Sequence, residues 1–192
     1  MALQDFALAW KKGEVMRIDF LELIHFRNIQ SEKISFEGKK FVALIGDNGS
    51  GKTAFLEAIT KAFAPVLRAV NGEAVKQCDL ANNDIKHGAS GVAVTVGMEL
   101  EDEKFVWTNK RRRSSRVPFE EAIESKEQGQ NDLKRLKQKY ADCVANEALP
   151  LVLYYGTDRI IREVPKRGHI KSFEVTDALN NCFDNANYFR DF

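Results

Sequence analysis

One segment constrains what this chain can fold into more than any other: Gly46-Asp-Asn-Gly-Ser-Gly51-Lys52-Thr53. It fits the pattern G-x-x-x-x-G-K-[ST] at every position. The continuous apolar run Phe41–Ile45 precedes it, and apolar residues at helical spacing from Phe55 to Phe63 follow it. A buried strand, a glycine-rich loop and an amphipathic helix in this order are the context in which the pattern forms a phosphate-binding P-loop.

The chemistry of such a loop gives each residue type a role. Glycines let backbone N–H groups wrap a phosphate without Cβ clashes, and the following helix adds its positive dipole end. Lys52 places an ammonium on the β- and γ-phosphates, and the Thr53 hydroxyl is expected to ligate Mg²⁺. The predicted cofactors are therefore ATP and Mg²⁺. The loop residues expected to bind the nucleotide are Gly46, Asp47, Asn48, Gly49, Ser50, Gly51, Lys52, Thr53 and Ala54.

Two other P-loop classes fit less well than an ATPase. A GTPase should carry D-x-x-G and N-K-x-D; the first is absent, and Asn109-Lys110 is followed by arginines instead of the guanine-reading aspartate. The lid of a small-molecule kinase is not evident either. The alternative to an ATP site is a degenerate P-loop that no longer binds nucleotide.

The remaining pattern predicts further strands and helices. Alternation from Met16 predicts a half-buried strand, and its slip near Phe20-Leu21 predicts a bulge. Pro65 is expected to end or kink the helix that follows the P-loop. Gln128–Asn131 is expected to interrupt the charged helical stretch 119–146 as a flexible point. Other elements are predicted as a strand at Lys33–Phe36, a hairpin from Val92 to Trp107 turning at Glu101–Glu103, a buried strand at Leu151–Tyr155, and a helix at Phe173–Phe183.

These elements predict an α/β P-loop NTPase with a mixed β-sheet, an antiparallel hairpin subdomain and flanking helices. A length of 192 residues, 44% of them hydrophobic, suits a single domain. We expect its core at 15–108 and 149–192, and a charged helical insert at about 110–148.

Charge and cysteine usage limit the partners and the compartment. The net charge of +1 gives no global basic field, so DNA binding would depend on the local run Lys110–Arg116, whose other reading is a solvated loop. Three cysteines without C-x-x-C pairing fit a reducing compartment, and the histidines share no metal-ligand spacing. No apolar segment is long enough to span a bilayer, and the first residues lack the apolar core of a signal peptide. We expect a cytoplasmic protein.

Two stretches carry a family resemblance. Phe26-Arg27-Asn28, followed by Val42-Ala-Leu-Ile-Gly-Asp-Asn-Gly-Ser-Gly-Lys-Thr-Ala-Phe-Leu-Glu-Ala-Ile59, resembles the N-terminal half of RecF/SMC-type ABC ATPase heads, most strongly over residues 15–63. A weaker similarity, through Asn83-Asp84-Ile85 and Tyr154-Tyr155-Gly156-Thr157-Asp158-Arg159, is to OLD-like and anti-phage-defence AAA ATPases.

The resemblance implies further site residues. It implies that Arg27, Asn28 and Asn48 lie beside the nucleotide, although Arg27 also fits an ordinary surface arginine after a strand. Where the family has a Q-loop glutamine, this chain has Thr157 and Asp158, which are candidates for a related polar role. The resemblance also implies a second ATPase head as a partner, since such heads sandwich ATP between two subunits.

Several family motifs do not occur in this sequence. The signature sequence, the Walker B acid and the switch histidine lie in the C-terminal half of such heads, and 1–192 is interpreted as the N-terminal part. Because the acid and the water-activating glutamate are absent, no catalytic set is complete beyond phosphate stabilisation by Lys52. We expect the chain alone to bind ATP with little turnover.

Two functions follow. The first is an ATP-binding head that acts in DNA repair, DNA processing or phage defence, in which hydrolysis drives head dimerisation. The second is a nucleotide-sensing interaction module that assembles with an effector partner and hydrolyses little ATP.

Overall fold

The computed structural model describes residues 16–39, 41–71, 79–114, 118–119, 126–145, 152 and 154. The predicted helix at Phe173–Phe183, most of the strand at Leu151–Tyr155, and Arg116, Thr157 and Asp158 lie outside the described residues. In the described part, no helix is long and apolar enough to cross a membrane.

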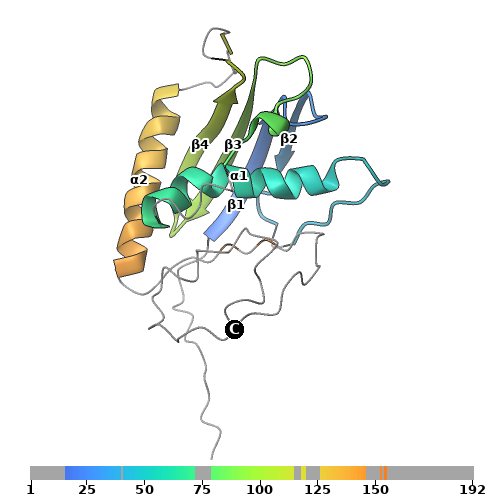
Figure 1. Ribbon diagram of the computed structural model, residues 1–192. Coiled ribbons are helices and arrows are strands. Elements are labelled where there is room, and N and C mark those ends of the chain that lie inside the picture. The colour runs from blue at the N-terminus through green and yellow to red at the C-terminus, as the bar shows by residue number, and fades with distance from the viewer. Residues whose placement is uncertain are drawn as a thin grey trace, which may run out of the picture.

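A four-stranded antiparallel sheet forms the centre of the structure, in the order β2-β1-β3-β4 (Figure 1). The strands are β1 (Met16–Ile24), β2 (Ser31–Ser35), β3 (Gly91–Leu100) and β4 (Glu103–Arg112). The predicted first strand, second strand and hairpin are therefore confirmed. The register between β1 and β3 shifts between Ile18 and Phe20, which places the predicted bulge at Asp19.

The turn between β3 and β4 consists of Glu101 and Asp102, which have φ angles of 50° and 64°. A two-residue connection with positive φ at both positions matches the right-handed twist of the paired strands. Helix α2 (Lys126–Ala145) stabilises this turn, because Lys139 on the helix forms ion pairs with Glu101 at 2.7 Å and Glu103 at 2.6 Å.

Helix α1 (Lys52–Asn71) crosses one face of the sheet, and α2 runs beside the edge strand β4 (Figure 1). The core lies between α1 and the sheet. Its largest fully buried side chain is Trp107, which meets Phe63 of α1 edge-on with ring centroids 5.3 Å apart. The indole N–H of Trp107 donates a hydrogen bond of 2.8 Å to the carbonyl of Ala62. Helix α1 is therefore fixed to β4 by both apolar packing and a buried hydrogen bond.

Pro65 does not end α1, contrary to the sequence prediction. A proline inside a helix has no N–H for the carbonyl four residues before it, which here is the carbonyl of Lys61. The side-chain amide of Asn109 on β4 donates a hydrogen bond of 2.8 Å to that carbonyl. The sheet thus replaces the helical hydrogen bond that Pro65 removes, and the helix continues to Asn71.

The predicted flexible point at Gln128–Asn131 is also wrong, since α2 is continuous through it. An interior glycine costs a helix about 1 kcal/mol, but tertiary contacts override such a preference. The buried carboxylate of Asp132 accepts a hydrogen bond of 3.1 Å from the backbone N–H of Val106. Helix α2 thus supplies an acceptor for a backbone donor of the edge strand β4.

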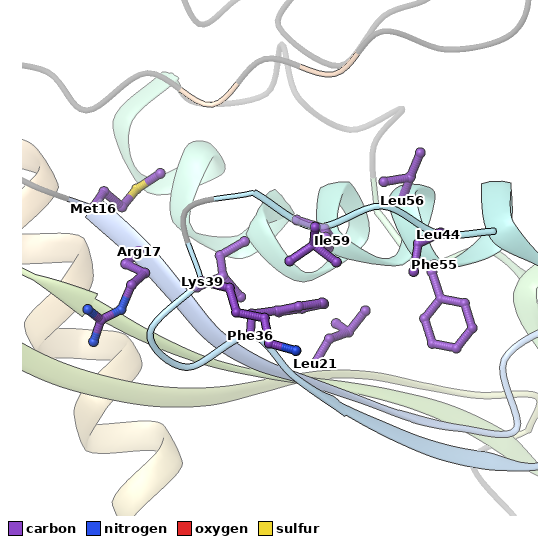
Figure 2. Close-up of a pocket in the computed structure, with 11 residues that line it drawn as sticks. Met16, Arg17, Leu21, Phe36, Lys39, Leu44, Phe55, Leu56 and Ile59 are labelled. Atoms are coloured by element: carbon purple, nitrogen blue, oxygen red, sulfur yellow. The ribbon is translucent and has the colours of Figure 1, made fainter.

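The predicted buried strand at Phe41–Ile45 is not a strand in the structure. No described strand pairs with it, and an extended segment needs neighbours to satisfy its backbone and cover its side chains. Phe41 is 84% exposed and Ile45 94% exposed. Val42 and Leu44 instead border an apolar cavity of about 520 Å³ between this segment, β1 and α1 (Figure 2). The described sheet is consequently antiparallel, without the parallel strands that a mixed sheet requires.

The exchange of hydrogen bonds around Pro65 gives a stability prediction. Asn109→Ala should lower the free energy of unfolding by about 1–3 kcal/mol, because the buried carbonyl of Lys61 loses its donor. In a Pro65→Ala background the cost should be smaller, since the substituted alanine supplies the missing helical N–H. Urea denaturation of the four proteins measures both costs. Equal costs in the two backgrounds would contradict this account of Asn109.

Candidate functional site

The glycine-rich loop leads directly into the first turn of α1. Gly49 and Gly51 have φ angles of 85° and 94°, a region that side chains other than glycine rarely occupy. The first α-helical hydrogen bond runs from the N–H of Phe55 to the carbonyl of Gly51. The amides before Phe55 therefore belong to the helix N-terminus, which favours an anion through its free N–H groups and its dipole.

The Lys52 side chain folds over this loop. Its ammonium donates hydrogen bonds to the carbonyl oxygens of Gly46 at 2.7 Å and Asp47 at 2.6 Å. The Ser50 side chain lies close to Gly46, because a Cβ on Gly46 would lie 2.9 Å from the hydroxyl oxygen of Ser50. The lysine charge is thus held at the concave side of the loop by carbonyl groups, which are neutral partners that an anionic phosphate can replace.

A tight turn between β1 and β2 lies next to the loop. Asn28 belongs to this turn, and its side-chain oxygen is 3.9 Å from the position of a Cβ on Gly51. The backbone of the turn pairs with the segment 84–86, through an isolated bridge between Phe26 and Ile85. The turn at 25–30 therefore lies against the segment at 80–89 on one side and the start of α1 on the other.

Arg27 lies at the centre of this junction and has a positive φ of 53°. Its Nε donates to Asp84 at 3.2 Å, and its guanidinium also pairs with Glu57 on α1. Burial alone would lower the pKa of Arg27, but the hydrogen bonds and charges of Glu57 and Asp84 outweigh it and raise the pKa. The guanidinium is therefore held between two carboxylates, one on α1 and one on the segment 80–89.

A polar cavity of about 560 Å³ opens beside Arg27 and Asn28. Amide and cationic side chains line most of it. The lining residues are Arg27, Asn28, Asn82, Asn83, Ile85, Lys86, His87 and Arg113. Lys86 closes one side by donating a hydrogen bond of 2.8 Å to the backbone carbonyl of Asn28. Asn28 both lines this cavity and lies beside Gly51 at the end of the loop, so it links the cavity to the loop.

Two arginines of the basic run, Arg111 and Arg113, help to hold the fold. Lys110, Arg111 and Arg112 belong to β4 and are not part of a free loop. Arg111 donates hydrogen bonds to the carbonyl of Leu80 and the side chain of Asn82, both at 3.0 Å. Arg113 donates to the carbonyl of Ala89 at 3.3 Å. These arginines fasten the segment 80–89 to the end of β4.

The structure places Asn28 beside Gly51 of the glycine-rich loop and Arg27 against Glu57 on the helix that begins with Lys52 and Thr53, whereas Thr157 and Asp158 lie outside the described residues. Among the described residues no group of His, Cys, Asp and Glu side chains is arranged to hold a metal ion. Glu57, Lys86 and Arg113 were not predicted as site residues. Glu57 lies in the stretch that resembles the RecF/SMC-type heads and Arg113 in the basic run, but their contacts depend on how β4, α1 and the segment 80–89 meet.

Comparisons with known proteins agree with the sequence resemblance. A family profile described as an AAA domain matches residues 21–192. Retron Vc95 probable ATPase of Vibrio cholerae serotype O1 biovar El Tor is 27% identical over 192 residues, which cover 92% of this chain and 36% of that protein. Retron Ec83 probable ATPase of Escherichia coli is 20% identical, over 88% of this chain and 31% of that protein.

Two further matches are more local or more distant. DNA replication and repair protein RecF of Synechococcus sp. (strain JA-3-3Ab) is 52% identical over 44 residues, which cover 23% of this chain and 11% of that protein. A solved structure described as ATP-driven dimerization and DNA-stimulated activation of SMC ATPases covers 76% of this chain and 86% of that chain, with 18% identity and a TM-score of 0.33. This chain spans only about a third of the length of the retron ATPases. Because the AAA profile covers most of its residues, the chain belongs to the AAA domain family and is related to the RecF and retron ATPases.

Proposed function

We propose that this chain is the nucleotide-binding part of an ATPase head and that it binds ATP with Mg²⁺ at the glycine-rich loop. One observation carries the proposal. The positive φ angles of Gly49 and Gly51 place a closely turned backbone in front of α1, with Lys52 folded over it. Backbone amides, a helix N-terminus and a lysine that converge on one point are the chemistry that holds a polyphosphate.

The proposed binding step is an exchange of partners. The ammonium of Lys52 leaves the carbonyls of Gly46 and Asp47 and pairs with the β- and γ-phosphates, which is a stronger, charge-assisted interaction. The Thr53 hydroxyl in the first turn of α1 is the residue that would hold Mg²⁺, and the remaining ligands of the ion would be phosphate oxygens and water. This fits the described residues, in which no acidic cluster forms a separate metal site.

The polar cavity beside Asn28 is the proposed position of the ribose and the base of the nucleotide. A ligand whose phosphates lie on the loop passes Asn28, and its ribose and base then face the amides of Asn82 and Asn83. Amide side chains donate and accept hydrogen bonds, so they suit the edges of a base without selecting strongly between adenine and guanine. We therefore propose only a modest preference for ATP over GTP.

Hydrolysis needs groups that the described residues do not include. Transfer of the phosphoryl group to water requires an acid that helps Thr53 to position the Mg²⁺ and a residue that orients the water. The retron ATPases are about three times as long as this chain, which supports the proposal that further sequence supplies these groups. The exposed apolar run at Phe41–Ile45 also fits a strand that additional strands would cover.

In the proposed whole protein, ATP binding and hydrolysis drive the association of two heads, in DNA repair, DNA processing or phage defence. The name of the RecF relative, a DNA replication and repair protein, supports the first of these settings. The second candidate is a nucleotide-sensing module that assembles with an effector partner and hydrolyses little ATP. This candidate requires the nucleotide site but not the groups that orient a water for hydrolysis. Contact with DNA through the run Lys110–Arg116 has weaker support, since Arg111 and Arg113 bind backbone carbonyls of this chain.

The nucleotide site is tested by removing its lysine. Lys52→Ala should weaken the binding of a fluorescent ATP analogue by at least about tenfold, because the loop loses the ammonium that pairs with the phosphates. Lys134→Ala, on the exposed side of α2, is the matched control and should bind like the unaltered chain. Equal affinity of all three proteins would rule out the P-loop as the binding site.

The basic run gives a second prediction. Arg111→Ala should lower the free energy of unfolding by about 1 kcal/mol, because the carbonyl of Leu80 and the side chain of Asn82 lose a charged donor. Arg112→Ala, at the exposed neighbouring position, should change it by less than about 0.5 kcal/mol. Urea denaturation separates the two. A larger cost at Arg112 would show that the structural role has been assigned to the wrong arginine.

A further inference from the structure

Asp84 is an unusually buried charge. Its residue is 3% exposed, and aspartate is rarely buried to this extent unless its carboxylate is paired. One carboxylate oxygen accepts a hydrogen bond of 2.9 Å from the backbone N–H of Ala81 and lies 3.7 Å from the ammonium of Lys61. The other accepts a hydrogen bond of 3.2 Å from Nε of Arg27. The carboxylate therefore connects the segment 80–89, α1 and the turn that carries Arg27.

Arg27 is attached to Asp84 through its backbone as well. The N–H of Arg27 donates a hydrogen bond of 2.8 Å to the carbonyl of Asp84, while its φ of 53° is unfavourable for a residue with a side chain. Such a conformation persists only where the surroundings determine it strongly, and this often happens at functional sites. Asp84 thus fixes both the backbone and the guanidinium of an arginine that lines the polar cavity.

The second carboxylate on Arg27 has a different environment. The Glu57 side chain is 25% exposed, against 5% for Asp84, and it lies on α1 one helical turn after Thr53. An exposed carboxylate can leave an arginine at low cost because water solvates it, whereas a buried carboxylate left without its partner is strongly destabilised. When an anionic ligand approaches Arg27, Glu57 is consequently the partner that gives way, and Asp84 remains.

We propose that Asp84 is a positioning residue for nucleotide binding: it holds Arg27 in the orientation that meets the nucleotide, and Glu57 is the partner that the nucleotide displaces. This inference rests on the proposed ATP site. It predicts opposite effects for two carboxylates that touch the same arginine. A general electrostatic effect would be the same for both, since removal of either negative charge favours an anionic ligand.

The test is a titration of the full chain with a fluorescent ATP analogue in Mg²⁺. Glu57→Gln should bind the analogue about two- to fivefold more tightly, because Arg27 no longer has to give up the more exposed of its two ion pairs. Asp84→Asn should bind it about tenfold more weakly, although this variant also removes a negative charge. Tighter binding by Asp84→Asn would overturn the proposal, since it would show that Asp84 acts only through its charge.

A double-mutant cycle separates positioning from folding. In an Arg27→Ala background, Asp84→Asn should leave the affinity for the analogue unchanged. It should still lower the thermal midpoint of unfolding, because the N–H of Ala81 then donates to an amide oxygen in place of a carboxylate. The same loss of affinity in both backgrounds would contradict a role through Arg27. If Asp84→Asn does not fold, Arg27→Lys takes its place: it keeps the charge but lacks the planar fork that spans Asp84 and Glu57. Arg27→Lys should bind more weakly, and undiminished binding would overturn the proposal.

Lys52→Ala in the same titration distinguishes the two claims. If the unaltered chain binds and Lys52→Ala does not, the ATP site stands, and the Asp84 and Glu57 variants then decide the inference. If Lys52→Ala binds as well as the unaltered chain, or the unaltered chain does not bind at all, the proposed site itself is wrong and the inference fails with it.

Discussion

The position of helix α1 on the antiparallel sheet determines the geometry of the candidate site, because the same helix presents its N-terminus to the glycine-rich loop. Two hydrogen bonds to helix carbonyls and one contact between aromatic rings fix this position of α1. Trp107 donates to the carbonyl of Ala62 and packs on Phe63, and Asn109 donates to the carbonyl that Pro65 leaves without a helical partner. The amides and the lysine at the start of α1 are therefore held by contacts made much further along the helix.

Near the N-terminal end of α1, ion pairs attach the helix to the neighbouring segments. Glu57 on α1 and Asp84 on the segment 80–89 both pair with Arg27, so the turn between β1 and β2 is tied to the helix and the segment together. Arg111 at the end of β4 and Arg113 just after it hold the same segment by its carbonyls. Elements far apart in the sequence thus line one polar cavity beside Asn28, and the proposed nucleotide site depends on this arrangement.

Local patterns predicted much of the fold. Alternation predicted β1 and the β3–β4 hairpin, and the loop motif with its spacing predicted where α1 begins. The failures have tertiary causes. Pro65 was expected to end α1, but Asn109 of another element replaces the lost hydrogen bond, and Phe41–Ile45 was expected to be a buried strand, but no described strand lies beside it. The partners of Arg27 were not predictable either, because they depend on side chains meeting across the sheet end.

The central claim is that the glycine-rich loop and the polar cavity together form one nucleotide site. Amide chemical shifts of the isotopically labelled chain, recorded with and without ATP and Mg²⁺, test it most directly. The account predicts that the largest changes fall on the amides of Gly49–Thr53, with a second group at Arg27, Asn28 and the segment 82–87. Changes confined to the apolar cavity beside β1, or to Lys110–Arg113, with the loop amides unaffected, would contradict it.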